Sequence, residues 1–170
     1  VKTIERNAFK NCMRLEKIEI PDSVTEIGEG AFYYCISLKE VVGGKNLKKL
    51  GGEAFAYCKN LEKITLSSTL TQIGYSIFYG CEKLKTAGPE SGEYNIKIGF
   101  SGNIPNCPFA DSYLESIVIP EKTTSIGQMA YSDCSYLKEV KLPSGVKTIE
   151  RNAFKNCMRL EKIEIPDSVT

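Results

Sequence analysis

The chain contains no histidine and no tryptophan among its 170 residues. Histidine is the most common general base near neutral pH and the most common neutral metal ligand in proteins. Its absence excludes a Ser-His or Cys-His nucleophile and any zinc site with a histidine ligand. Acidic side chains are plentiful but do not converge on one place in the repeat pattern described below. We therefore expect no catalytic residues, no cofactor and no bound metal.

The sequence also lacks an excess of one charge and any long apolar run. Its 22 basic and 21 acidic side chains give a net charge of +1, whereas phosphate binding needs clustered positive charge. No run approaches the ~18 apolar residues of a membrane-spanning helix. We find no signal peptide or anchor motif. These absences predict no nucleic-acid partner and no membrane insertion in this segment, and the 42% apolar content is typical of a soluble globular chain.

What the sequence has in abundance is internal repetition. The shared pattern is V-x-x-I-(G)-x-x-A-F-x-x-C-x-x-L-x-x-I-x-I-P-x-S, with units starting near residues 1, 24, 47, 70, 93, 123 and 146. Successive starts are 23 residues apart, except for one step of 30 residues after residue 93. The first 25 residues, VKTIERNAFKNCMRLEKIEIPDSVT, recur unchanged as residues 146–170.

Each unit combines a short extended piece, a predicted helical turn and a second strand. The segment LEKIEIP alternates apolar and polar residues as a half-buried strand does, and its proline ends the strand. The residues between the two extended pieces, such as EGAFYYC, have the spacing of a short helical turn. A unit of this length cannot bury its apolar face alone and must stack on its neighbours. We therefore predict one α/β solenoid domain over residues 1–170, with a parallel sheet on one face.

The repeated AFxxCxxLxxIxIPxSVTxIG pattern resembles the BspA-type leucine-rich repeat of bacterial and protist surface proteins. The resemblance covers six of the seven units clearly, and only the unit near 93–122 departs from it. It implies a right-handed leucine-rich-repeat superhelix. It also implies an adhesion module that is secreted or displayed at the cell surface, binds a host, extracellular-matrix or other protein, and has no enzymatic activity.

Six of the seven cysteines occupy one position of the repeat, and Cys107 lies in the irregular unit. Their 23-residue spacing differs from the C-x2-4-C pairs of zinc sites. We interpret them as buried free thiols that pack as small apolar side chains. Disulfides between neighbouring units, and metal or redox chemistry, remain the alternatives. Cys107 is the one thiol that we expect to lie off the common position.

The residue after the conserved leucine alternates in charge through every unit: Glu16, Lys39, Glu62, Lys85, Glu115, Lys138 and Glu161. The next position alternates in the opposite phase wherever it is charged. Neighbouring parallel strands lie about 5 Å apart, so this order places opposite charges side by side. It predicts a surface whose charges fix the stacking register, or alternatively a surface that docks a protein partner.

Two departures from the repeat are candidate binding regions. The stretch 88–111 is rich in glycine and proline, and we expect it to bulge from the solenoid as a loop and to bend the sheet. Several tyrosines also lie on or beside the predicted helical turns, where they either bind a partner or shield the solenoid. The candidate protein-binding residues are Tyr94, Phe100, Ile104 and Phe109, which are contact or packing residues of the stretch, and Tyr33, Tyr34, Tyr57 and Tyr79.

These observations favour a non-enzymatic protein-binding module of a surface adhesin, which presents its sheet face and the 88–111 stretch. The alternative is a structural spacer or a self-stacking segment whose parent protein binds elsewhere. The duplicated 25 residues further predict either an excerpt from a tandem array with a 145-residue period or a chain that stacks end to end.

Overall fold

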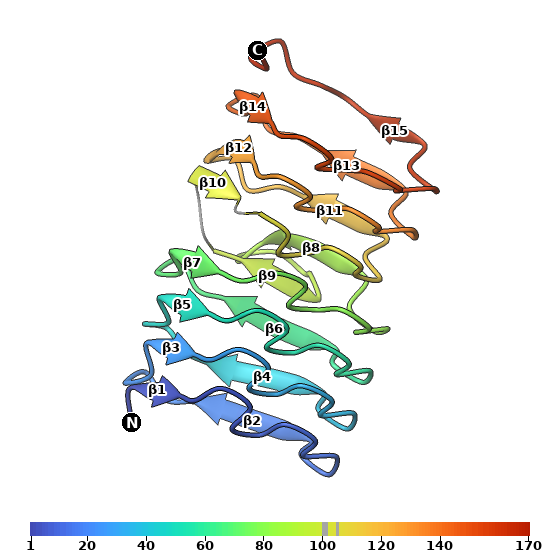
Figure 1. The fold of residues 1–170 in the computed structure, drawn as a ribbon. Coiled ribbons are helices and arrows are strands. Elements are labelled where there is room, and N and C mark those ends of the chain that lie inside the picture. Colours follow the sequence, from blue (N-terminus) through green and yellow to red (C-terminus); the bar gives the residue numbers. More distant parts are fainter. Residues whose placement is uncertain (100–101, 105) are drawn as a thin grey trace.

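The computed structural model describes residues 1–99, 102–104 and 106–170, and it shows a solenoid of stacked parallel strands (Figure 1). Each repeat unit forms one turn of the solenoid, which we call a rung. Rungs 1 to 4 comprise residues 1–23, 24–46, 47–69 and 70–92, and rungs 5 to 7 comprise 100–122, 123–145 and 146–170, with a segment 93–99 between rungs 4 and 5. The predicted stacking of repeats about a parallel sheet is confirmed.

One face of the solenoid is an eight-stranded parallel sheet in the order β15-β13-β11-β8-β9-β6-β4-β2. Its strands are β2 (Lys17–Ile20), β4 (Glu40–Gly43), β6 (Lys63–Leu66), β8 (Thr86–Pro89), β9 (Ile96–Ile98), β11 (Ser116–Val118), β13 (Glu139–Lys141) and β15 (Lys162–Ile163). The isoleucines and leucines of the L-x-x-I-x-I pattern point inward and the residues between them point outward, as in Ile64 and Leu66 of β6, which are buried.

Two smaller parallel sheets contain the first extended piece of each rung. The first has the order β1 (Thr3–Ile4), β3 (Glu26–Ile27), β5 (Lys49–Leu50) and β7 (Gln72–Ile73). The second has the order β10 (Gly102–Ile104), β12 (Thr123–Ile126) and β14 (Thr148–Ile149). This side of the solenoid is therefore divided between rungs 4 and 5, whereas the large sheet is continuous.

The predicted helical turns are wrong: in the part of the chain that the structure describes, no helix is present. In rung 1 the N–H groups of Ala8, Lys10 and Cys12 donate to carbonyls three residues earlier. The alternate N–H groups of Asn7, Phe9 and Asn11 instead donate to carbonyls of rung 2 over 2.7–3.0 Å. Left-handed backbone at Asn7 (φ 58°) and Asn11 (φ 62°) turns these groups outward. A helix would direct every N–H along its own axis, so this segment is a run of turns that extends the hydrogen bonding between rungs.

The core is a column of one aromatic ring per rung. Phe9, Phe32 and Phe55 stack with ring centroids 5.1 Å apart, close to the spacing of parallel strands. Around Phe78 the centroid distances widen to 6.3 Å from Phe55 and 6.2 Å to Phe109. The column then returns to 5.1 Å between Phe109 and Tyr131.

The widening coincides with an extra strand in the large sheet. Strand β9, from the stretch that we expected to bulge as a loop, lies between β6 and β8 and pairs with both. The residues Ala87-Gly88-Pro89, which we did not expect to form a strand, belong to β8. The loop expectation is therefore wrong for this part of the stretch, because Ile96 and Ile98 bury their side chains in the core as other strands do. The fifth unit, expected to start near Glu93, has its own first strand at β10.

Candidate functional site

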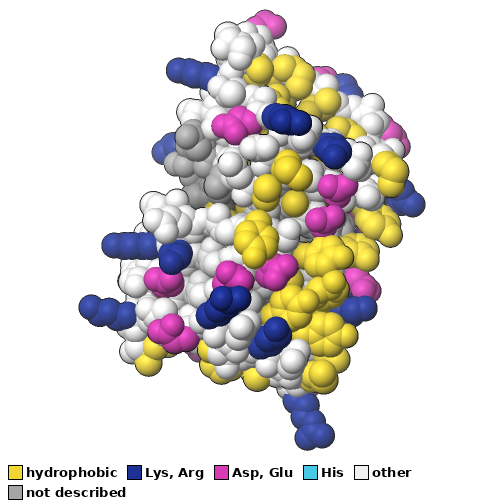
Figure 2. Space-filling view, viewed as in Figure 1, with side chains coloured by type: hydrophobic (Ala, Val, Ile, Leu, Met, Phe, Trp, Pro, Cys, Tyr) yellow, Lys and Arg dark blue, Asp and Glu magenta, His cyan; other side chains and the backbone are white. Residues whose placement is uncertain are grey.

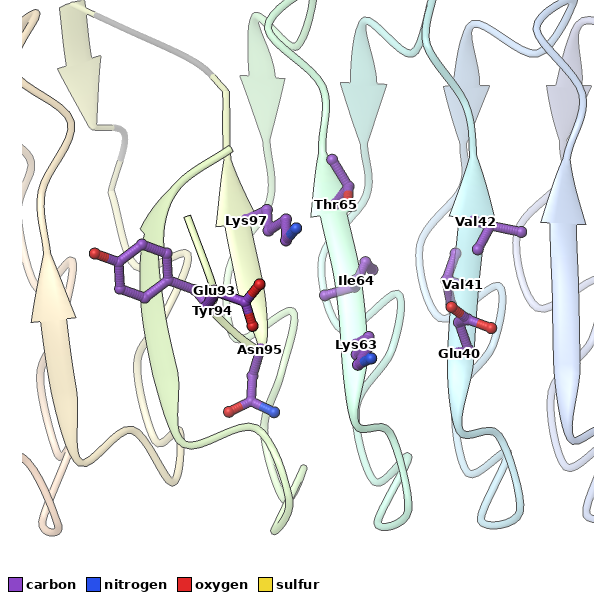
Figure 3. A pocket seen from close by; sticks show the side chains of 10 residues that line it. All are labelled: Glu40, Val41, Val42, Lys63, Ile64, Thr65, Glu93, Tyr94, Asn95 and Lys97. Carbon is purple, nitrogen blue, oxygen red and sulfur yellow. The ribbon is translucent and has the colours of Figure 1, made fainter. Parts of the chain in front are cut away.

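The inserted strand is reached by a short return segment that crosses the outer face of β8. After Pro89 the chain reverses, with the N–H of Gly92 donating to the carbonyl of Pro89 over 2.9 Å. It then passes back under Tyr94, whose ring lies against Gly88 and Gly92. A Cβ atom on Gly88 would lie 2.5 Å from the Tyr94 ring, so only glycine leaves room for this crossing. Figure 3 shows the Tyr94 ring over β8.

Asn95 fixes the inserted segment to the strands on both sides. Its Nδ2 donates to the carbonyl of Glu62 over 2.6 Å, and its backbone N–H donates to Thr86 Oγ1 over 3.1 Å. These bonds replace the charged neighbours that the other rungs have at this point. Consequently Glu62 pairs with Lys83 at 3.3 Å, and Lys85 pairs with Glu115 at 3.3 Å on the far side of the insert.

A polar groove of about 410 Å³ lies on the outer face of β4, β6 and β9, beside the return segment (Figure 3). Its charged lining residues are Glu40, Lys63, Glu93 and Lys97. Glu40 forms an ion pair with Lys17 at 2.8 Å, which lowers the pKa of its carboxyl group. No ion pair is found for Lys63 or Lys97 within the described residues. The groove therefore offers two lysine ammonium groups on a sheet face that is otherwise balanced in charge.

The candidate residues of the 88–111 stretch have different environments. Tyr94 is half-buried against the glycines, and Phe100 lies outside the described residues. Ile104 is 1% exposed and Phe109 is 0% exposed. Of the two roles that the sequence left open for them, contact and packing, burial leaves packing, because Phe109 supplies the ring of rung 5 to the aromatic column.

The four other candidate tyrosines form one continuous surface, which we call the tyrosine surface (Tyr33, Tyr34, Tyr57 and Tyr79). Tyr57 contacts all three others, with ring centroids 5.5 Å from Tyr33, 5.7 Å from Tyr34 and 4.9 Å from Tyr79. Tyr34 and Tyr79 are 36% and 37% exposed. Figure 2 shows hydrophobic side chains, the class that includes tyrosine, gathered along the right-hand edge of the molecule.

Two members of the tyrosine surface occupy backbone that disfavours them. Tyr34 (φ 62°) and Tyr57 (φ 59°) are both left-handed, a conformation that glycine and asparagine adopt most easily. The equivalent residues are Asn11 in rung 1, Gly80 in rung 4 and Asn156 in rung 7. Gly80 also makes room for its neighbour, because a Cβ atom there would lie 2.8 Å from the Tyr57 ring. Tyrosine at 34 and 57 therefore does not serve the backbone.

A second aromatic pair was not among the predicted site residues. Tyr113 and Tyr136 stack with centroids 5.1 Å apart. The ammonium group of Lys85 lies 5.5 Å from both rings, and the Arg159 guanidinium lies 5.0 Å from the Tyr136 ring. The signal in the sequence is that all three aromatic or basic residues precede the conserved leucine in successive rungs. The one-residue deletion in rung 5, between Ser112 and Leu114, obscures that alignment.

The family follows from a direct comparison with known repeats. The model of the BspA type leucine-rich repeat region matches residues 2–99 and 102–170, in six copies. The chain belongs to the BspA-type leucine-rich-repeat family. No functionally curated protein matches it in sequence.

Solved structures agree with this assignment. A leucine-rich repeat protein from Bacteroides ovatus is 30% identical over 99% of the chain, with a TM-score of 0.74. The leucine-rich repeat protein TpLRR of T. pallidum is 24% identical over 94% of the chain, with a TM-score of 0.72. The chain spans 42% of the length of the Bacteroides protein and 72% of the length of TpLRR.

The cysteines of this BspA-type chain are free thiols, as predicted. Each donates to the carbonyl of the core aromatic residue one rung earlier, for example Cys58 Sγ to Phe32 at 3.2 Å and Cys134 Sγ to Phe109 at 3.2 Å. Burial raises the pKa of Cys134 to about 12 and that of Cys157 to about 11. Cys107 lies off this position, as expected, and Ser112 takes the place of the thiol in its rung.

The alternating charges of the BspA-type rungs form ion pairs between neighbours. Lys39 pairs with Glu16 at 2.9 Å, Lys17 with Glu40 at 2.8 Å and Arg6 with Glu29 at 3.2 Å. All of these side chains are exposed, so each pair contributes only about 0–1 kcal/mol. Their value lies in register, because a shift by one rung would place like charges together.

Metal-binding and membrane-spanning features were also sought. Over residues 1–99, 102–104 and 106–170, no group of three or more acidic or cysteine side chains is arranged to hold a metal ion. Nor do those residues contain a helix that is long and apolar enough to cross a membrane.

Proposed function

We propose that this BspA-type segment is a non-enzymatic module that binds another protein outside the cell. The observation that carries the proposal is the tyrosine surface, where Tyr34 and Tyr57 hold left-handed backbone that other rungs assign to asparagine or glycine. Backbone strain that the surrounding packing maintains is typical of functional positions. Tyrosine anchors bury much area at low entropic cost when a protein partner docks.

The groove beside β9 supports a second contact region on the sheet face. Lys63 and Lys97 suit an acidic segment of the same partner, and the return segment that contains Glu93 and Tyr94 forms one wall. This arrangement fits the expected use of the sheet face and the 88–111 stretch. Localisation at the surface or in the medium, and a host or matrix partner, are part of the proposal and rest on the family resemblance.

The test measures binding of the chain to a panel of purified extracellular-matrix proteins immobilised on a sensor. The decisive variant is Tyr34→Asn with Tyr57→Asn, because asparagine tolerates the left-handed backbone and removes only the rings. The expected result is a loss of binding of about tenfold or more, with stability unchanged or increased. Lys122→Ala, an exposed residue outside both regions, is the matched control. Equal binding by the double variant would contradict a role for the tyrosine surface.

The second candidate function is a structural spacer or a self-stacking segment. It is favoured by the exposed apolar residues of the terminal rungs, such as Met158 and Ile165. A chain that binds no protein in the panel but associates with itself would support this candidate.

A further inference from the structure

The two terminal rungs have one sequence, but each is covered on a different side. Residues 1–25 and 146–170 are identical. Rung 1 is covered by rung 2 on the side toward the C-terminus, and rung 7 is covered by rung 6 on the side toward the N-terminus. The contacts between rungs 1 and 2 therefore describe what fits the open side of rung 7.

Backbone groups on the open side of rung 7 are ready to pair with a further rung. The N–H groups of Asn7, Phe9 and Asn11 donate to Glu29, Ala31 and Tyr33 of rung 2. No backbone acceptor is found in the described structure for the equivalent N–H groups of Asn152, Phe154 and Asn156.

Side chains on the open side of rung 7 also differ from their covered copies. Ile20 is 2% exposed, whereas the equivalent Ile165 is 53% exposed. Lys17 reaches Glu40 of the next rung, whereas the equivalent Lys162 pairs with Glu164 in its own rung at 2.6 Å. The same sequence thus has one set of partners when covered and another when open.

Charge decides which rung of a second copy fits there. Rung 2 fits, because Glu29, Lys39 and Glu40 are opposite in sign to Arg151, Glu161 and Lys162. Rung 1 does not fit, because stacking it on rung 7 would align Arg6 with Arg151, Glu16 with Glu161 and Lys17 with Lys162. Simple end-to-end stacking of whole chains therefore places like charges together at three positions.

We propose that two copies of this chain associate by rung replacement, in which rung 7 of one copy displaces rung 1 from rung 2 of the other. The displacing rung has the sequence of the rung it replaces, so the contacts with rung 2 are recreated residue for residue. Only Val169 and Thr170 must give way, since Val24 and Thr25 of the second copy already occupy their places.

The balance of rungs favours replacement at high concentration. In a solenoid each rung is costly to order alone, and its interfaces with neighbours repay that cost. Two separate copies order fourteen rungs and form twelve interfaces, given seven rungs and six interfaces in each. The replaced pair keeps twelve interfaces but orders only thirteen rungs, because one rung 1 is released. Such exchange of an identical element is the principle of domain swapping.

This inference deepens the second candidate function, and it is independent of binding through the tyrosine surface. The first experiment separates monomer from oligomer of the intact chain by size-exclusion chromatography and exposes each to limited trypsin. Rung replacement predicts an oligomer in which cleavage after Arg6 and Arg14 is faster than in the monomer, because rung 1 is released. Slower cleavage there would show end-to-end stacking and overturn replacement. A chain that remains monomeric at millimolar concentration overturns both forms of self-association.

The second experiment reverses three charges of rung 7 with Arg151→Glu, Glu161→Lys and Lys162→Glu. Under rung replacement these changes oppose Glu29, Lys39 and Glu40 of the other copy, and self-association weakens by about tenfold or more. Under end-to-end stacking they complement Arg6, Glu16 and Lys17, and self-association strengthens, which overturns the proposal. Lys122→Glu changes the net charge equally at an exposed site outside both interfaces and is the control. Because the reversal also brings like charges to rung 6, the trypsin pattern of the wild-type oligomer decides if rung 7 of the variant frays.

Discussion

The ring of Tyr94 lies directly on Gly88, where the chain folds back to insert β9 between β6 and β8. The two residues are mutually required, because a Cβ atom at position 88 would enter the ring. This contact lets the large sheet hold a strand that belongs to no repeat unit.

Gly88→Ala is expected to destabilise the chain by about 1–3 kcal/mol, the usual cost of forcing extra atoms into a packed site. Urea unfolding measures this change. Gly145→Ala is the matched control, since a Cβ atom there would have ordinary contacts at 3.6 Å, and it should change stability by less than about 0.5 kcal/mol. Adding Tyr94→Ala should remove most of the cost of Gly88→Ala, and strictly additive effects would contradict the contact.

Tyr34→Asn and Tyr57→Asn are expected to leave the free energy of unfolding unchanged or to raise it by up to about 1 kcal/mol each. The reason is that asparagine relieves the left-handed strain, which costs about 1–2 kcal/mol, while losing part of the ring packing. The control variants are Tyr33→Asn and Tyr79→Asn, which lie in ordinary backbone and should only lose stability. Thermal unfolding that ranks all four variants alike would argue against the strain.

The outward lysines that alternate with glutamates should not be equivalent. Lys39→Glu and Lys85→Glu break ion pairs with Glu16 and Glu115, and Lys85 also lies over two tyrosine rings. We expect each to cost about 0.5–1.5 kcal/mol at low salt and less at 0.5 M NaCl, because salt screens exposed charges. Lys138→Glu, for which no ion pair is found among the described residues, should cost less. Melting temperatures that do not depend on salt would contradict the role of the charges in register.

Stability is expected to fall with rising pH above about 9. Burial holds the pKa of Cys134 at about 12 and that of Cys157 at about 11, above the ordinary value of 9.0. A group with a higher pKa in the folded state binds protons more tightly there, so its contribution is complete below pH 9 and is lost as the pH rises through the folded value. Urea unfolding between pH 8 and 11 measures the effect, and Cys134→Ser should reduce it. A flat profile would mean that the thiols are not buried.

The regular rungs could be predicted because each inference rested on many copies of the same pattern. Seven leucines followed by alternating charges define the strand register, and the paired register of Lys17 with Glu40 and Glu40 with Lys63 agrees with it. The free thiols followed from spacing alone. The helical turn was wrong because an i, i+1, i+4 spacing of Ala31, Phe32 and Cys35 does not distinguish a helix from consecutive turns that bond to the next rung.

The irregular stretch could not be predicted in the same way, because it occurs once. The sequence IKI reads as a strand, but nothing local indicates that it pairs with β6, a strand more than twenty residues earlier. The glycines at 88 and 92 resembled a loop, although they serve the close passage of Tyr94. For the tyrosine surface, the sequence identified the residues, and only the backbone angles separated Tyr34 and Tyr57 from their neighbours.

The position of β9 has a consequence for the order in which the solenoid forms. In rungs 1 to 3 each new strand of the large sheet adds to the edge left by the strand before it, so ordering can follow the chain from one end. At β6 this rule fails, because the strand that completes its edge is β9, and β8 precedes β9 in the chain. The second half of the solenoid therefore reaches its final register only after residues 96–98 have taken their place, which makes this short strand the step on which growth of the sheet past rung 3 depends.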